Sequence, residues 1–155
     1  KEISQVLIQQ NSENKQIYEE NTEKYIKDLE KVEKQYEEIS QELNGQKAIC
    51  LNEALEYLAK DIKLEYISLH TDHDENSMSA ESIKNIINKM NTENIKIILI
   101  GKDDSIKNAE ILANETNAKI YKLDTVLTGA TDKSAYIDAA NRNLEVLKSV
   151  LGDEK

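Results

Sequence analysis

Proline is absent from this chain of 155 residues, and cysteine occurs once. The lack of proline removes the rigid turns that a fixed φ provides. The single Cys50 can form no internal disulfide, and its place in an apolar, strand-like run favours a buried, inert thiol. No apolar run approaches the roughly 20 residues that cross a bilayer. The start, Lys1-Glu2-Ile3-Ser4, lacks the apolar core of a secretion signal, so we expect any such signal to have been removed or to lie upstream.

Basic residues are also too few to balance the acidic ones. The chain has 20 Lys and Arg against 30 Asp and Glu, a formal net charge of −10. This charge repels a phosphate backbone, and no basic stripe offsets it, so we expect no nucleic-acid partner. The acidic surface suits solubility and could also attract cations. With 39% apolar residues, a chain of this length can bury about two thirds of its unfolded surface.

Two helices are predicted at the start of the chain. Residues 1 to about 10 fit the end of one helix, and a long helix is expected over about 14–44, closed by Asn44-Gly45. Its apolar residues step by seven, four and three: Tyr18, Tyr25, Leu29, Val32, Tyr36, Ile39 and Leu43. That spacing fits a coiled-coil seam or packing on the chain's own sheet. We favour the sheet, because the helix leads straight into a strand.

Strands and helices alternate after Gly45. Strands are predicted over 47–51, 64–69, 95–100 and 118–123, and helices over 53–62, 79–91, 105–117 and 133–151. Residues 95–100 are almost continuously apolar, as expected of a strand covered on both faces. The pattern predicts an α/β fold in which a four-stranded parallel sheet is flanked by helices and preceded by a long helix. We expect one domain over 1–155, with 1–44 as a helical lead-in and 45–155 as the alternating lobe, and a monomer.

Polar residues and a glycine follow the predicted strands: Asn52, His70, Gly101 and Asp124. The carboxyl ends of parallel strands meet at one edge of a sheet, where such proteins bind their ligands. We therefore expect the binding site at this edge.

Several of these segments carry a family resemblance. They are Asn52-Glu53-Ala54-Leu55-Glu56-Tyr57-Leu58-Ala59, Leu123-Asp124, the final helix with Tyr136 and Asn143, and Asn11-Ser12-Glu13-Asn14 followed by Tyr18 and Asn21. Together they resemble the carboxyl-terminal lobe of the metal-binding subunits of zinc and manganese ABC importers. The resemblance covers nearly the whole chain.

The resemblance implies one lobe of an extracytoplasmic solute-binding protein that is not an enzyme. Its implied partners are the membrane permease of the importer and an N-terminal lobe, missing here, that supplies two His ligands in the family. The family association also implies a lipoprotein and a link with cell adhesion. The chain departs from the family at Asn52, where the family has a His or Glu ligand, at Gly101, where Glu is usual, and at Thr125, where Pro is frequent. We therefore expect weak or absent binding of zinc or manganese. The alternative is a degenerate interaction module that binds no metal.

Four residues are candidate metal ligands: Asp124, Asn52, His70 and His73. Asp124 matches the family's metal carboxylate, and the alternative is a turn or N-cap role. Asn52 offers a neutral amide, a poor zinc ligand, and is equally suited to cap a helix. His70 and His73 lie in a run of two imidazoles and three carboxylates, which is either a solvated loop or a replacement for the ligand lost at Asn52.

Other chemistries have little support. Gly101-Lys102-Asp103-Asp104-Ser105 could form a phosphate-binding turn, but it lacks further glycines, and two carboxylates would repel phosphate. The same two carboxylates are a thin basis for a flavodoxin-like signalling domain. No arrangement of Ser or Cys with His indicates a nucleophile.

Overall fold

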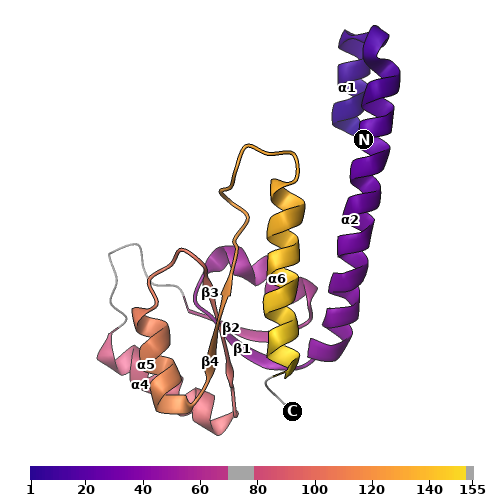
Figure 1. Ribbon diagram of the computed structural model, residues 1–155. Coiled ribbons are helices and arrows are strands. Elements are labelled where there is room, and N and C mark those ends of the chain that lie inside the picture. Colours follow the sequence, from indigo (N-terminus) through magenta and orange to yellow (C-terminus); the bar gives the residue numbers. More distant parts are fainter. Residues whose placement is uncertain (70–78, 153–155) are drawn as a thin grey trace. The chain divides into compact units, whose positions relative to one another are not determined.

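The computed structural model describes residues 1–69 and 79–152 (Figure 1). The predicted ligands His70 and His73 lie outside these ranges. Contacts divide the chain into two compact units, residues 1–35 and 36–155. The expectation of a single domain therefore stays a prediction, and each unit is described by itself. No helix in the described ranges is both long and apolar enough to span a membrane.

The first unit is a pair of helices. Helix α1 (Glu2–Gln10) is followed by a short 3-10 turn (Ser12–Asn14) and by α2 (Lys15–Leu43), which continues into the second unit. The buried Ser4 hydroxyl donates to the carbonyl oxygen of Tyr18 at 3.5 Å, which ties α1 to the start of α2. The predicted long helix over about 14–44 is thus present as α2.

The second unit alternates strands and helices as predicted. Its elements are β1 (Lys47–Cys50), a 3-10 turn (Glu53–Leu55), α3 (Glu56–Asp61), β2 (Glu65–Ser68), α4 (Ala80–Thr92), β3 (Ile97–Gly101), α5 (Lys107–Thr116), β4 (Lys119–Leu123) and α6 (Ala135–Gly152). All strand pairs are parallel, and the order in the sheet is β2-β1-β3-β4. This arrangement confirms the predicted α/β class.

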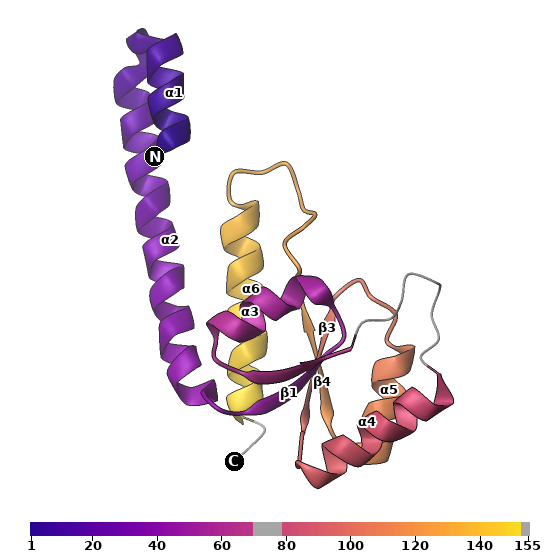
Figure 2. The ribbon, with the colours of Figure 1, turned by 180° about the vertical axis from the view of Figure 1, so that it is seen from behind.

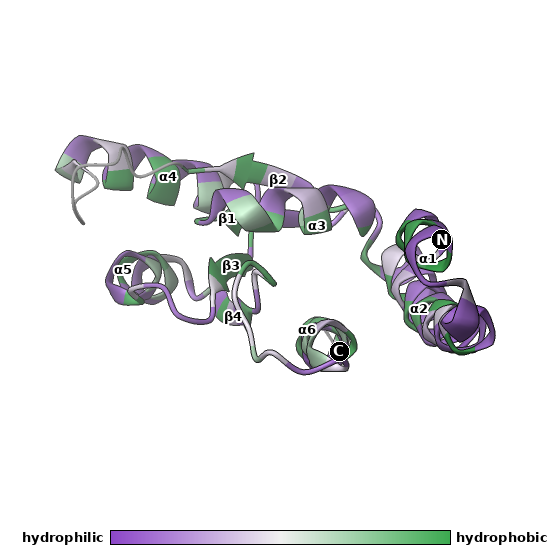
Figure 3. Ribbon diagram, turned by 90° about the horizontal axis from the view of Figure 1, so that it is seen from above, coloured by the Kyte–Doolittle hydropathy of each residue, from purple (hydrophilic) through white to green (hydrophobic). Residues whose placement is uncertain are grey.

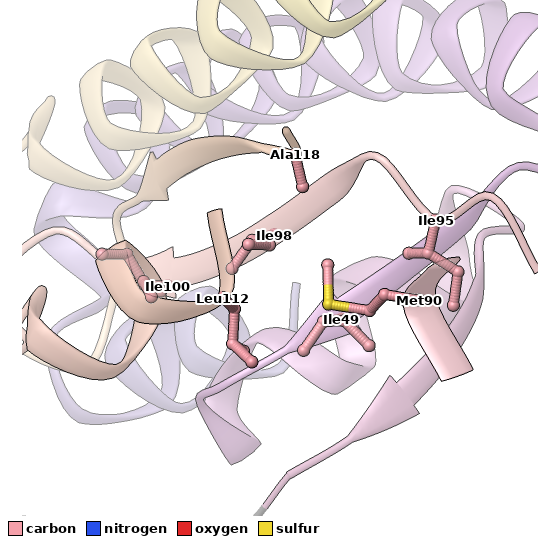
Figure 4. Close-up of a cluster of buried hydrophobic side chains, with 8 residues drawn as sticks. Ile49, Met90, Ile95, Ile98, Ile100, Leu112 and Ala118 are labelled. Carbon is pink, nitrogen blue, oxygen red and sulfur yellow. The ribbon is translucent and has the colours of Figure 1, made fainter. Parts of the chain in front are cut away.

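Helices cover both faces of the sheet. Figure 3 shows α4 and α5 on one side of the strands and α3 and α6 on the other, and Figure 2 shows the same layers from behind. Ile49, Ile98 and Ile100 pack with Met90 of α4 and Leu112 of α5 (Figure 4). Every residue of β3 is buried, which confirms the prediction of a strand covered on both faces.

The last part of α2 belongs to the sheet-containing unit. Ile39 and Leu43 are buried there, and the Tyr36 hydroxyl donates to the carbonyl oxygen of Ala140 in α6 at 3.0 Å. Within the second unit, these residues at the end of α2 therefore pack as the apolar spacing predicted.

Four tight connections lead from a helix to the next strand, and each contains one residue with positive φ. These residues are Gly45, Lys63, Asn94 and Asn117. Glycine and asparagine tolerate this left-handed conformation, and Lys63 adopts it as well, so the chain makes sharp turns without proline. The connections from β3 to α5 and from β4 to α6 are longer and lie at the opposite edge of the sheet, where the strands end.

Candidate functional site

The carboxyl edge of the sheet brings three predicted positions onto adjacent strands. Asn52 follows β1, Gly101 ends β3, and Asp124 follows β4, and these strands are neighbours in the sheet. Gly101 is in register with Leu123, and the amide of Lys102 donates to the carbonyl oxygen of Leu123 at 2.8 Å. The ladder therefore sets Lys102 beside Asp124.

The backbone of Asp124 is clamped by one side chain of α6. The Asp124 amide donates to Oδ1 of Asn143 at 2.7 Å, and Nδ2 of Asn143 donates back to the Asp124 carbonyl oxygen at 2.8 Å. Both residues are buried, with 6% of Asp124 and 3% of Asn143 exposed. Two reciprocal hydrogen bonds in a buried place fix the position of Asp124.

The carboxylate of Asp124 is held by three donors. Its Oδ1 accepts from the amide of Val126 at 2.9 Å, and its Oδ2 lies 2.9 Å from Lys102 Nζ and 3.2 Å from Arg142 Nη2. Burial alone would raise the pKa of Asp124, but the Val126 amide and the two cations outweigh it and lower that pKa. Asp124 therefore carries a negative charge that is already neutralised within the chain.

The loop after Asp124 adopts a strained turn. Val126 has φ of 59°, a conformation that β-branched residues rarely adopt. The bond from its amide to the carboxylate two residues earlier is an Asx-type turn. The turn role that we considered for Asp124 is thus present, and its role as a metal ligand stays a prediction.

Asn52 caps the short helix that follows β1. Its Oδ1 accepts from the amide of Ala54 at 2.9 Å, and its Nδ2 donates to Oδ2 of Asp104 at 2.8 Å. The capping role considered from sequence is therefore present. Both ends of the amide are engaged, although the oxygen keeps a second lone pair.

Asp104 fills the space in front of Gly101. Its Oδ2 accepts from the amide of Gly101 at 2.9 Å, and a Cβ placed on Gly101 would lie 2.6 Å from the same oxygen. A side chain at position 101 is therefore excluded while Asp104 keeps this place. The Gly101 amide is thus already engaged by the carboxylate of Asp104.

The arrangement can offer part of a metal coordination sphere. It combines the carboxylates of Asp124 and Asp104 with the amide oxygen of Asn52, all hard oxygen donors. Within residues 1–69 and 79–152, no three His, Cys, Asp or Glu side chains form a group that could hold a metal ion. A second source of ligands would be needed for a closed site.

Sequence reasoning missed the roles of Lys102, Arg142 and Asp104. The contact of Lys102 with Asp124 follows from the register of β3 with β4, which is a property of the folded sheet and not of the local sequence. The Gly-x-x-Asp spacing of Gly101 and Asp104 was a local signal for a turn closed by a carboxylate. Arg142 gave no signal of its own, because its contact with Asp124 depends on how α6 packs.

Sequence comparison gives a match over nearly the whole chain. Residues 1–150 match the family described as ZnuA, zinc-uptake complex component A periplasmic. The chain is 31% identical over 156 aligned positions to the high-affinity zinc uptake system protein ZnuA of Bacillus subtilis strain 168. The alignment covers 97% of this chain and 49% of that protein, so the chain spans about half the length of this curated relative.

Solved structures share the fold. The metal-dependent lipoprotein YcdH of Bacillus subtilis is 28% identical, with a TM-score of 0.77 over 95% of this chain and 57% of that one. The laminin-binding protein Lmb of Streptococcus agalactiae, described as an adhesin with metal-transporting activity, is 23% identical, with a TM-score of 0.75 over 96% of this chain and 58% of that one. The family match, the curated relative and the shared fold agree, and the chain belongs to the ZnuA family of zinc-uptake components.

Proposed function

We propose that this chain is the carboxyl-terminal lobe of the extracytoplasmic solute-binding subunit of an ABC importer for a divalent metal, zinc or manganese. The observation that supports it most is the family match over residues 1–150, together with a buried, negatively charged Asp124 at the carboxyl edge of the sheet. In this proposal the metal is cargo, and the protein carries it without a chemical reaction.

We propose two partners, a further lobe of the kind that the uncovered half of the curated relative would provide and the membrane permease of the importer. An N-terminal lobe would supply the remaining ligands, and the membrane permease would receive the metal. We propose a monomer without affinity for nucleic acid, in keeping with the net charge of −10. Anchoring as a lipoprotein and adhesion, which the descriptions of YcdH and Lmb mention for those proteins, are further proposals for the full subunit.

Within this chain, Asp124 is the proposed first ligand, and Asn52, His70 and His73 are the proposed additional ones. Only Asp124 among these four is a ligand at a position where the family has one, and the neutral amide of Asn52 is a poor zinc ligand. We therefore expect this chain alone to bind zinc or manganese no more tightly than micromolar.

Calorimetric titration of the chain with zinc chloride and manganese chloride tests the proposal. Asp124→Asn removes the charge but keeps an acceptor for the Val126 amide, so the fold should persist while metal binding is lost. Asp132→Asn is the matched control, because Asp132 is an exposed carboxylate that also accepts a backbone hydrogen bond. Equal binding by the parent and Asp124→Asn would refute the assignment of Asp124.

A second candidate is an interaction module of the same fold that binds no metal. Its support is that Lys102 and Arg142 neutralise Asp124, and that Asn52 is engaged by Ala54 and Asp104. The same titration separates the two candidates, since this one requires that neither metal binds.

A further inference from the structure

The ammonium group of Lys102 contacts Asp124, the proposed metal ligand, where a metal ion would bind. Its Nζ lies 2.9 Å from Oδ2 of Asp124, whose side chain is only 5% exposed, while 42% of the Lys102 side chain is exposed. The ammonium group therefore caps a buried carboxylate from the solvent side. A metal ion that binds Oδ2 of Asp124 therefore encounters this charge, together with that of Arg142.

A metal ion would compete with Lys102 and Arg142 for the lone pairs of the Asp124 carboxylate. A carboxylate has about four acceptor positions, and three donors already occupy it: the Val126 amide on Oδ1, and Lys102 with Arg142 on Oδ2. A divalent ion at Oδ2 would be repelled at short range by both cations, so its binding is favoured when at least one of them is displaced.

Lys102 is the better placed of the two competitors. It is fixed at its base, because its amide continues the ladder from β3 to Leu123 of β4. Arg142 is longer, 62% exposed and 0.3 Å farther from Oδ2, at 3.2 Å against 2.9 Å. Asp103 lies 3.9 Å from Lys102 Nζ, a looser contact that leaves Asp124 as the main partner.

We propose that Lys102 is an internal competing cation that sets the affinity of this lobe for divalent metal. The side chain neutralises Asp124 when no metal is bound and swings into solvent when metal arrives. This inference rests on the proposed function, because it assigns a role to Lys102 at the same site. It predicts that the weak binding of the lobe comes partly from a tethered charge and not only from missing ligands.

The first test is a titration with zinc chloride of the 155-residue chain and its Lys102→Met variant. Methionine keeps much of the length of the side chain without the charge, and Arg142 remains to balance Asp124. We expect about fivefold tighter binding, which corresponds to the loss of about 1 kcal/mol for a partly exposed ion pair. The control Lys122→Met removes an exposed lysine of β4 and should change the affinity less than about twofold.

The second test observes the lysine itself. In NMR spectra of the ¹⁵N-labelled lysine ammonium groups, the Lys102 signal of the parent should be resolved without metal. Its chemical shift should change when Asp124 is replaced by Asn, and it should also change when the parent is saturated with zinc. The chemical shift of Lys122 should stay the same in both comparisons.

The outcomes separate this inference from the proposed function. If the parent binds zinc through Asp124 and Lys102→Met binds equally or more weakly, the inference is overturned and the proposed function stands. A Lys102 signal that is insensitive to Asp124→Asn overturns it as well. If neither the parent nor Lys102→Met binds zinc, the inference is overturned, and the proposed function is overturned with it when manganese chloride gives no binding either.

Discussion

The contact between Gly101 and Asp104 allows a quantitative prediction. A Cβ on Gly101 would lie 2.6 Å from Oδ2 and 2.8 Å from Cγ of Asp104. In Gly101→Ala the carboxylate must move, and its bonds from the Gly101 amide and from Nδ2 of Asn52 are lost. Loss of the acceptor for a buried amide costs about 1–3 kcal/mol.

The same substitution should be harmless when the carboxylate is absent. Gly101 does not have a positive φ, so alanine fits its backbone, and replacement of glycine by alanine at such a position stabilises by about 0.4–1 kcal/mol. We therefore expect Gly101→Ala to lower the free energy of unfolding by about 1–2 kcal/mol in the parent and to raise it slightly in Asp104→Ala. The coupling energy should be about 2 kcal/mol.

Urea unfolding of the four proteins of this cycle, followed by circular dichroism at pH 7, measures the coupling. Gly129→Ala is the control, because a Cβ there meets no atom within 4 Å, and it should change the free energy of unfolding by less than about 0.5 kcal/mol. Equal destabilisation by Gly101→Ala in both backgrounds would show that Asp104 does not fill this space.

Three further predictions concern other parts of the chain. Burial raises the pKa of Tyr36 to about 12, so Tyr36 loses its proton at lower pH in the unfolded state than in the folded state. About 2 kcal/mol of the free energy of unfolding should therefore be lost between pH 10 and 12. Urea unfolding at pH 9 and 11.5 should show a smaller loss of this free energy in Tyr36→Phe than in the parent. Val126→Asn should raise the free energy of unfolding by about 1 kcal/mol by relieving a positive φ, whereas Leu127→Asn, at an exposed position without that conformation, should not. If the predicted ligands His70 and His73 replace the donor lost at Asn52, changing both to Ala should abolish zinc binding in calorimetry, and a double variant that binds like the parent would reject them.

The course of the backbone was largely predictable from the sequence. Continuous apolar character located β3, and the Asn44-Gly45 pair located the end of α2, since both signals are local. The contact of the Tyr36 hydroxyl with the carbonyl oxygen of Ala140 was not predictable, because apolar spacing along a helix does not say which element it packs against.

The arrangement of the candidate site residues along the sheet edge was predictable, but their contacts were not. The rule that parallel strands end at one edge placed Asn52, Gly101 and Asp124 together. The pairing of Asp124 with Lys102 depends on the register of β3 with β4, and the link from Asn52 to Asp104 joins side chains 52 residues apart. Neither follows from residue type or spacing.

The position of bound metal tests the proposed function most directly. Crystals of the chain grown with zinc should give an anomalous scattering peak about 2.0–2.2 Å from a carboxylate oxygen of Asp124, with Lys102 Nζ displaced from its 2.9 Å contact. A peak only at other surface carboxylates, or none at Asp124 while Lys102 and Arg142 keep their contacts, would contradict the assignment of this edge as a metal site.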